Sequence, residues 1–216
     1  MQLAILLFDR FTTLDAVGPY EVLSRLPDTE TVFVAERTGP VTNDVGHPTL
    51  VATKTLAEVP SPDLVLVPGG PGQAELMSDG PVHEWLRAAD RTSTWTTSVC
   101  TGSLILAAAG LLTGRRATSH WALVNQLPGL GAIVADQRVV FDGKYVTAAG
   151  VSSGIDMALS LAGRIAGDDV AQMLQLGIEY DPEPPYRAGN PKTAPAELVE
   201  LMRGNLRAVM SGAGTV

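Results

Sequence analysis

Runs of aliphatic and β-branched residues are the feature of this sequence that most restricts its fold. The clearest are LAILLF (3–8), TVFVAE (31–36) and DLVLVPG (63–69), and a weaker, Thr/Ser-rich run is TSTWTTSV (92–99). Strands with one face in water alternate apolar and polar residues, whereas continuous runs are typical of parallel strands covered on both faces. A fifth strand, KYVTAAG (144–150), follows the turn FDGK, which indicates a hairpin. These runs predict a mostly parallel sheet.

Segments with apolar residues at helical spacing lie between and after the strands. They cover residues 14–26, 80–90, 101–112, 154–167, 168–180 and 195–210. Strand–helix alternation of this kind predicts an α/β fold. We predict a single domain over 1–216, in which the Pro/Gly-rich piece 181–195 is an ordered loop and 211–216 is a frayed tail.

Charge and composition exclude several classes of function. The net charge is −8 and the densest basic pair is Arg115–Arg116, so we expect no nucleic-acid partner. The longest late apolar run, 104–112, is about half a membrane span, and the N-terminus has no signal-peptide pattern. One cysteine allows no internal disulfide, and with scattered histidines it gives no metal-ligand cluster. We expect a cytoplasmic protein with no membrane partner, metal or other cofactor.

That single cysteine, Cys100, lies in TTSVCTGSLILAAAG (96–110), where a strand run stops and a helical pattern begins. Ser98 and Gly102 flank it at the small-x-nucleophile-x-small spacing of a nucleophile elbow. A helix N-terminus favours a thiolate, and the N–H groups of Thr101 or Gly102 could hold a developing negative charge. The alternative is that Cys100 is a small buried apolar residue, as free cysteines usually are.

Two further segments follow strands and reach the same sheet edge. VPGGPG (67–72) is a Gly-rich turn whose N–H groups could face a ligand, or a turn that needs a positive φ at Gly69 or Gly70. It lacks the Lys and Ser/Thr of a phosphate-binding loop. Asp15, in FTTLDAVGPYEVL, is either a carboxylate at a helix N-terminus or an acid/base that faces Cys100. A carboxylate beside a thiol would share a proton with it.

The three histidines give a weaker signal. We expect His47 in a loop and His83 on a polar helix face, both solvated. His120, in ATSHWALVNQL, is expected near the sheet edge as a pocket residue. The residue after Cys100 is Thr101 rather than His, so no local Cys–His pair is present.

Taken together, these residues resemble the ThiJ/PfpI superfamily, whose fold is like the class-I glutamine amidotransferase domain. The similarity runs from LLFDRFTTLDAVGPYEVLSR through LVPGGPG, SVCTGSLILAAAGLLTGRRATSHW and TAAGVSSGIDMALSLAGRIAG to LQLGIEYDPEPPYRAGNP. It implies a flavodoxin-like three-layer sandwich with helices on both faces and the elbow at the carboxyl edge. Asp15 in LDAVGPYE, Cys-Thr-Gly at 100–102 and the tail EYDPEPPYRAGNP are most similar to the branch that hydrates isonitriles.

The resemblance also implies roles for individual residues. Asp15 would meet Cys100 as the acid/base, and Thr101 would orient the acid or a water molecule. Gly69–Gly70 would supply a backbone donor. Gly150–Val151 would begin the loop and helix packed beside the nucleophile.

The same resemblance separates this chain from neighbouring branches. Thr101 in place of His speaks against peptidase activity, and Asp15 in place of Glu speaks against the deglycase-like branch. A cofactor-independent lyase that acts on a small molecule as a homodimer is implied. The alternatives are a stand-alone small-molecule sensor, a redox sensor, and a glyoxalase-like enzyme that acts on 2-oxoaldehydes.

Overall fold

The computed structural model describes residues 1–210, so the expected frayed tail, 211–216, lies outside the described residues. Its centre is a seven-stranded sheet in the order β10-β11-β7-β6-β1-β2-β5, parallel except for β10. The strands are β1 (Gln2–Leu6), β2 (Glu30–Ala35), β5 (Lys54–Thr55), β6 (Leu64–Val67), β7 (Trp95–Val99), β10 (Val139–Asp142) and β11 (Tyr145–Ala148). Every residue of β6 and β11 is buried, as expected for strands covered on both faces.

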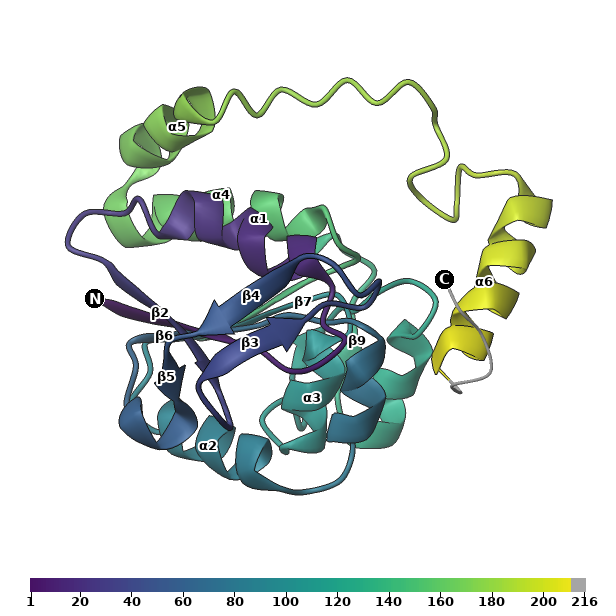
Figure 1. The fold of residues 1–216 in the computed structure, drawn as a ribbon. Helices are drawn as coiled ribbons and strands as arrows, with labels where there is room; N and C mark the ends of the chain where they lie inside the picture. Colours follow the sequence, from purple (N-terminus) through teal and green to yellow (C-terminus); the bar gives the residue numbers. More distant parts are fainter. Residues whose placement is uncertain (211–216) are drawn as a thin grey trace.

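Helices cover both faces of this sheet. Helices α1 and α4 lie side by side on one face, and α2 and α3 lie on the other (Figure 1). Their bounds are α1 (Thr13–Leu23), α2 (Pro81–Asp90), α3 (Gly102–Ala108) and α4 (Ser153–Ala166). The three-layer α/β sandwich implied by the sequence is confirmed.

Small elements at the margins were missing from the sequence prediction. They are two short sheets, β3 (Gly39–Thr42) with β4 (Thr49–Ala52) and β8 (Arg116–Ala117) with β9 (Ile133–Val134), and the 3₁₀ helices η1 (Leu56–Glu58), η2 (Pro71–Leu76) and η3 (Val124–Leu130). None of these strands exceeds four residues, so no periodicity marks them.

Two predicted elements are shorter than expected. Strand β7 starts at Trp95 rather than 92, because the Ser93 N–H bonds to the Ala89 carbonyl and closes the last turn of α2. Helix α3 ends at Ala108 rather than 112, and Gly110 follows in the left-handed region at φ +83°.

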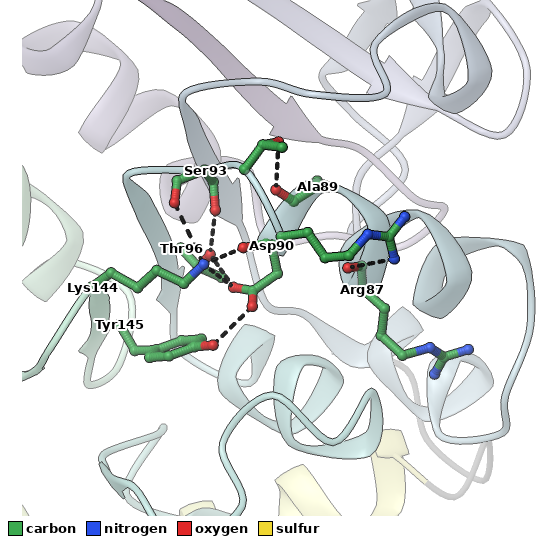
Figure 2. Close-up of polar contacts among 9 residues, drawn as sticks. Arg87, Ala89, Asp90, Ser93, Thr96, Lys144 and Tyr145 are labelled. Carbon is green, nitrogen blue, oxygen red and sulfur yellow. Dashed lines mark hydrogen bonds and ion pairs between the residues drawn. The ribbon is translucent and has the colours of Figure 1, made fainter.

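A polar cluster joins α2 to the amino ends of β7 and β11 (Figure 2). The Asp90 carboxylate accepts hydrogen bonds from Thr96 Oγ1 at 2.7 Å and Tyr145 Oη at 2.8 Å. Lys144 Nζ lies 3.2 Å from Asp90 Oδ1, and Ser93 Oγ lies 3.0 Å from Thr96 Oγ1. Each of these polar side chains has a partner within the cluster. The cluster lies at the sheet edge opposite the elbow. We assign it a structural role.

The chain leaves the sandwich after α4. Helix α5 (Asp168–Gly177) leads into an extended piece in which residues 181–190 are all exposed, and α6 (Ala196–Met210) follows (Figure 1). Helix α6 returns to the body, where it contacts η2, and the Arg203 guanidinium lies 5.6 Å from the Trp121 ring centre. None of the helices described is long and apolar enough to cross a membrane.

Candidate active site

The carboxyl ends of three neighbouring strands, β1, β6 and β7, define one short stretch of the sheet edge. After β1 the chain continues to β2, which lies on the far side of β1 from β6. After β6 it continues to β7, which lies on the far side of β6 from β1, so the two connections diverge between β1 and β6. Crevices at such switch points are the usual ligand sites of open α/β sheets. Asp15, Gly69 and Cys100 follow these three strands, and the fold brings them together.

Cys100 occupies a strained turn between β7 and α3. Its φ of +58° is left-handed, which is uncommon for a residue with a Cβ. Its N–H lies 3.1 Å from the Ala148 carbonyl and 2.9 Å from the Ala149 carbonyl. Its own carbonyl accepts hydrogen bonds from Ser103 Oγ at 3.2 Å and Ser119 Oγ at 3.0 Å. The backbone of the elbow is therefore fixed on both sides.

Gly102 is required by the close approach of α3 to β6. A Cβ at this position would lie 2.2 Å from the Val67 carbonyl oxygen and 2.7 Å from that of Pro68. The small residue expected after the nucleophile is explained by this contact. The packing thus shows a steric role for Gly102, and its N–H as a donor to a developing negative charge stays a prediction.

The Asp15 side chain is completely buried, although it belongs to the first turn of α1. Its Oδ2 accepts a hydrogen bond from the Gly69 N–H at 2.9 Å, and its Oδ1 has no hydrogen-bond partner in the described part of the chain. Burial raises the pKa of this carboxyl from 3.8 to about 7, against the lowering effect of the Gly69 N–H and the Cys100 thiol. The charge of Asp44 raises the pKa further.

The Cys100 thiol is almost fully buried, and its pKa is raised well above the ordinary value of 9.0. Burial is the largest cause and the negative charge of Asp15 is the second, while the N–H groups of Val151 and Thr101 lower the pKa. The Thr101 N–H at the start of α3 favours the thiolate, as expected, but desolvation and the charge of Asp15 outweigh it and the net shift of the pKa is upward. Asp15 and Cys100 titrate as a pair, and the one-proton form predominates above about pH 7.

The Gly69–Gly70 turn is pressed against the elbow. A Cβ at Gly69 would lie 2.4 Å from the Thr101 nitrogen, and Gly70 has a φ of +133°. The Gly70 N–H donates to Thr101 Oγ1 at 2.9 Å, and that hydroxyl lies 3.3 Å from the Gly70 carbonyl. The Thr101 hydroxyl is thus hydrogen-bonded to the turn rather than to Asp15. The Thr101 backbone N–H faces the Cys100 sulfur.

A second wall of the site is formed where β11 meets α4. A Cβ at Gly150 would lie 2.6 Å from His120 Cδ2, so the imidazole packs directly on this corner. Val151, next along, is strained at φ +28°. His120 Nδ1 accepts the Ala122 N–H at 3.3 Å, and burial lowers the pKa of its imidazole. His120 therefore packs on Gly150, and its ring centre lies 5.6 Å from that of Trp121.

Comparison with known proteins agrees with this geometry. The sequence pattern of the DJ-1/PfpI family matches residues 1–164. The chain belongs to the DJ-1/PfpI family. The crystal structure of a ThiJ/PfpI family protein from Pseudomonas syringae superposes with a TM-score of 0.93 and 37% identity, covering 98% of this chain and 88% of that one.

Two relatives of known name bear on function. The isonitrile hydratase of Pseudomonas putida is 45% identical over 203 residues, which are 94% of this chain and 89% of that protein. The transcriptional regulator CdhR of Pseudomonas aeruginosa is 38% identical over 92 residues, which are 41% of this chain and 27% of the regulator. The chain is a homologue of isonitrile hydratase over nearly its whole length.

Two histidines lie outside this DJ-1/PfpI site. His47 is exposed, as expected. The prediction that His83 is solvated is wrong: it is 1% exposed, because the inner face of α2 packs it on the body beneath η2. Burial lowers the pKa of its imidazole.

No sequence pattern pointed to Ser119, which binds the Cys100 carbonyl, or to Asp44, whose charge raises the pKa of Asp15. A cleft of about 480 Å³ lies farther along the same edge, over β1 and β2, and contains neither Cys100 nor Asp15. The described residues hold no group of three or more His, Cys, Asp and Glu side chains that could bind a metal ion.

Proposed function

We propose that this protein hydrates isonitriles, R–NC, to N-substituted formamides, with Cys100 as nucleophile and Asp15 as acid/base. The observation that carries the proposal is the buried Asp15 carboxyl beside the Cys100 thiol, with one oxygen unpartnered and a pKa of about 7. The 45% identity to the isonitrile hydratase of Pseudomonas putida over 94% of the chain supports it. An isonitrile needs both a nucleophile and a proton at its terminal carbon, and this pair supplies both.

The first step uses the one-proton form of the pair. The Cys100 sulfur forms a bond to the terminal carbon of the isonitrile while Asp15 transfers the shared proton to that same carbon. The product is a thioimidate, R–N=CH–S–Cys100, beside an ionised Asp15. The N–H groups of Thr101 and Val151, which favour negative charge on the sulfur, stabilise the thiolate that attacks.

The second step consumes water. The Asp15 carboxylate takes a proton from water as the hydroxide adds to the thioimidate carbon, and it passes that proton to the nitrogen. The tetrahedral adduct then collapses to R–NH–CHO: the carbon–sulfur bond breaks, and the hydroxyl proton returns to the Asp15–Cys100 pair. Acid–base assistance of this kind is worth about 10²–10⁴-fold in rate.

Formation of N-cyclohexylformamide from cyclohexyl isocyanide tests the proposal. Wild type should form the product, and Cys100→Ala and Cys100→Ser should form none while remaining folded by circular dichroism. Product formation by Cys100→Ala at the wild-type rate would contradict a thiol nucleophile. No product from wild type would overturn the reaction, and methylglyoxal would then test the glyoxalase-like alternative.

We further propose that the chain, as one domain, acts as a homodimer in the cytoplasm. Large apolar side chains in the C-terminal part are exposed, among them Met173 at 64%, Leu176 at 81% and Tyr186 at 79%. Such a surface is unusual unless a partner covers it. Sedimentation equilibrium should give twice the chain mass of 22.6 kDa, and Leu176→Glu should shift it toward the monomer. A wild-type monomer at micromolar concentration would contradict the dimer.

A further inference from the structure

The start of α1 carries a capping signature that the structure does not use. The sequence Thr12-Thr13-Leu14-Asp15 has the spacing of a capping box, in which the first side chain bonds to the fourth N–H and the fourth side chain bonds back. Thr12 is indeed the residue before α1, but its side chain makes no capping hydrogen bond. The Asp15 carboxyl is likewise turned away and accepts its hydrogen bond from Gly69.

Asp44 is the residue that holds the Thr12 hydroxyl. Thr12 Oγ1 donates to Asp44 Oδ2 at 2.7 Å, in a partly buried contact between segments 32 residues apart. The Asp44 N–H donates to the Phe11 carbonyl at 3.0 Å, and Asn43 Nδ2 donates to Thr13 Oγ1 at 2.9 Å. The loop after β3 is therefore bound along the whole turn that enters α1.

The same turn is bound to the active-site loop from its other side. The Thr12 N–H donates to the Gly69 carbonyl at 2.8 Å, and a Cβ at Gly70 would lie 2.5 Å from the Thr12 nitrogen. Thr12 thus links Asp44 to the loop whose N–H binds Asp15. Asp44 and Cys100 are the titratable groups that act on the Asp15 carboxyl.

We infer that Asp44 is a positioning residue for the acid/base Asp15: by binding the Thr12 hydroxyl it fixes the turn that enters α1 and holds the Gly69 loop, so that the Asp15 carboxyl remains directed at Cys100. This inference deepens the proposed isonitrile hydration and rests on it for its catalytic meaning. The negative charge of Asp44 adds a second effect, because it favours the protonated form of Asp15. Neither effect involves contact with the substrate.

Three variants separate the tether from the charge. Asp44→Asn keeps an oxygen for the Thr12 hydroxyl and removes the charge, Thr12→Val removes the tether and keeps the charge, and Asp44→Ala removes both. Asp9→Asn, which removes an exposed carboxylate just before the same turn, is the matched control. Each chain is labelled with ¹³C at the aspartate carboxyl carbon, and the Asp15 signal is assigned by its loss in Asp15→Asn.

We expect Asp44→Asn to lower the titration midpoint of Asp15, and Thr12→Val and Asp44→Ala to lower kcat for formamide formation about tenfold with KM nearly unchanged. Asp9→Asn should change neither quantity. An unchanged midpoint in Asp44→Asn, together with kcat within twofold of wild type in Thr12→Val and Asp44→Ala, would overturn the inference. The titration needs no substrate, so a failure of Asp44 can be distinguished from a failure of the proposed reaction.

Discussion

At the scale of single residues, the burial of Asp15 sets the chemistry of the site. A carboxyl with a pKa of about 7 can both donate and accept a proton near neutral pH, which an exposed aspartate does poorly. The Cys100 thiol shows the same balance: its two N–H contacts favour a thiolate, but burial and the charge of Asp15 raise its pKa. Burial is the largest cause of the raised pKa of both residues.

The same burial makes the stability of the protein depend on pH. The folded protein holds the Asp15 proton more tightly than the unfolded chain, whose carboxyl has a pKa of 3.8. The contribution of the bound Asp15 proton to the free energy of unfolding is therefore complete below about pH 4 and is lost as the pH rises to about 7. Its size is at most about 4 kcal/mol. Asp15→Asn removes this loss, because the amide carries no charge.

We thus expect Asp15→Asn to raise the free energy of unfolding at pH 8 by about 1–4 kcal/mol relative to wild type, and by much less at pH 4.5. Urea denaturation of both proteins at the two pH values measures the difference. An equal effect of the substitution at both pH values would show that the carboxyl is not buried as a charge at pH 8.

At the scale of elements, the approach of α3 to β6 gives the elbow its shape. Gly102 lies where a Cβ would overlap the Val67 carbonyl at 2.2 Å, and backbone atoms cannot move aside cheaply. We expect Gly102→Ala to lower the free energy of unfolding by about 3 kcal/mol or more and to abolish activity. Gly80→Ala, whose added Cβ meets nothing within 4 Å, should cost less than about 1 kcal/mol. Equal costs in thermal unfolding would contradict this reading of the elbow.

Sequence periodicity was sufficient for the long elements and failed for the short ones. Continuous apolar runs marked β1, β2 and β6 because both sheet faces are covered, and the FDGK turn marked the β10–β11 hairpin. The spacing of Thr12 and Asp15 fits a capping box that does not form, since Asp44 and Gly69 bind the two side chains instead. His83 was misjudged for a related reason: the face of α2 that carries it is buried against the body, which local sequence does not reveal.

At the scale of the whole molecule, the site depends on loops that are distant in sequence. Asp15, Gly69 and Cys100 follow three different strands, and their strand order could be inferred only from resemblance, because neither composition nor spacing reveals which strands are neighbours. Ser119 and Asp44 left no signal at all, since their contacts exist only after the sheet has formed. The exposed apolar side chains of the C-terminal part are accounted for by the proposed homodimer.

The central claim is that one shared proton between Asp15 and Cys100 drives isonitrile hydration, and the pH dependence of formamide formation tests it most directly. We would measure kcat/KM for cyclohexyl isocyanide from pH 5 to 9 with wild type and Asp15→Asn. Wild-type kcat/KM should fall as the pH drops below about 7, because protonation of Asp15 then leaves the pair with two protons. The kcat/KM of Asp15→Asn should be lower than that of wild type by about 10²-fold or more. Normal turnover by Asp15→Asn, or a wild-type rate that does not change between pH 5 and 8, would contradict the account.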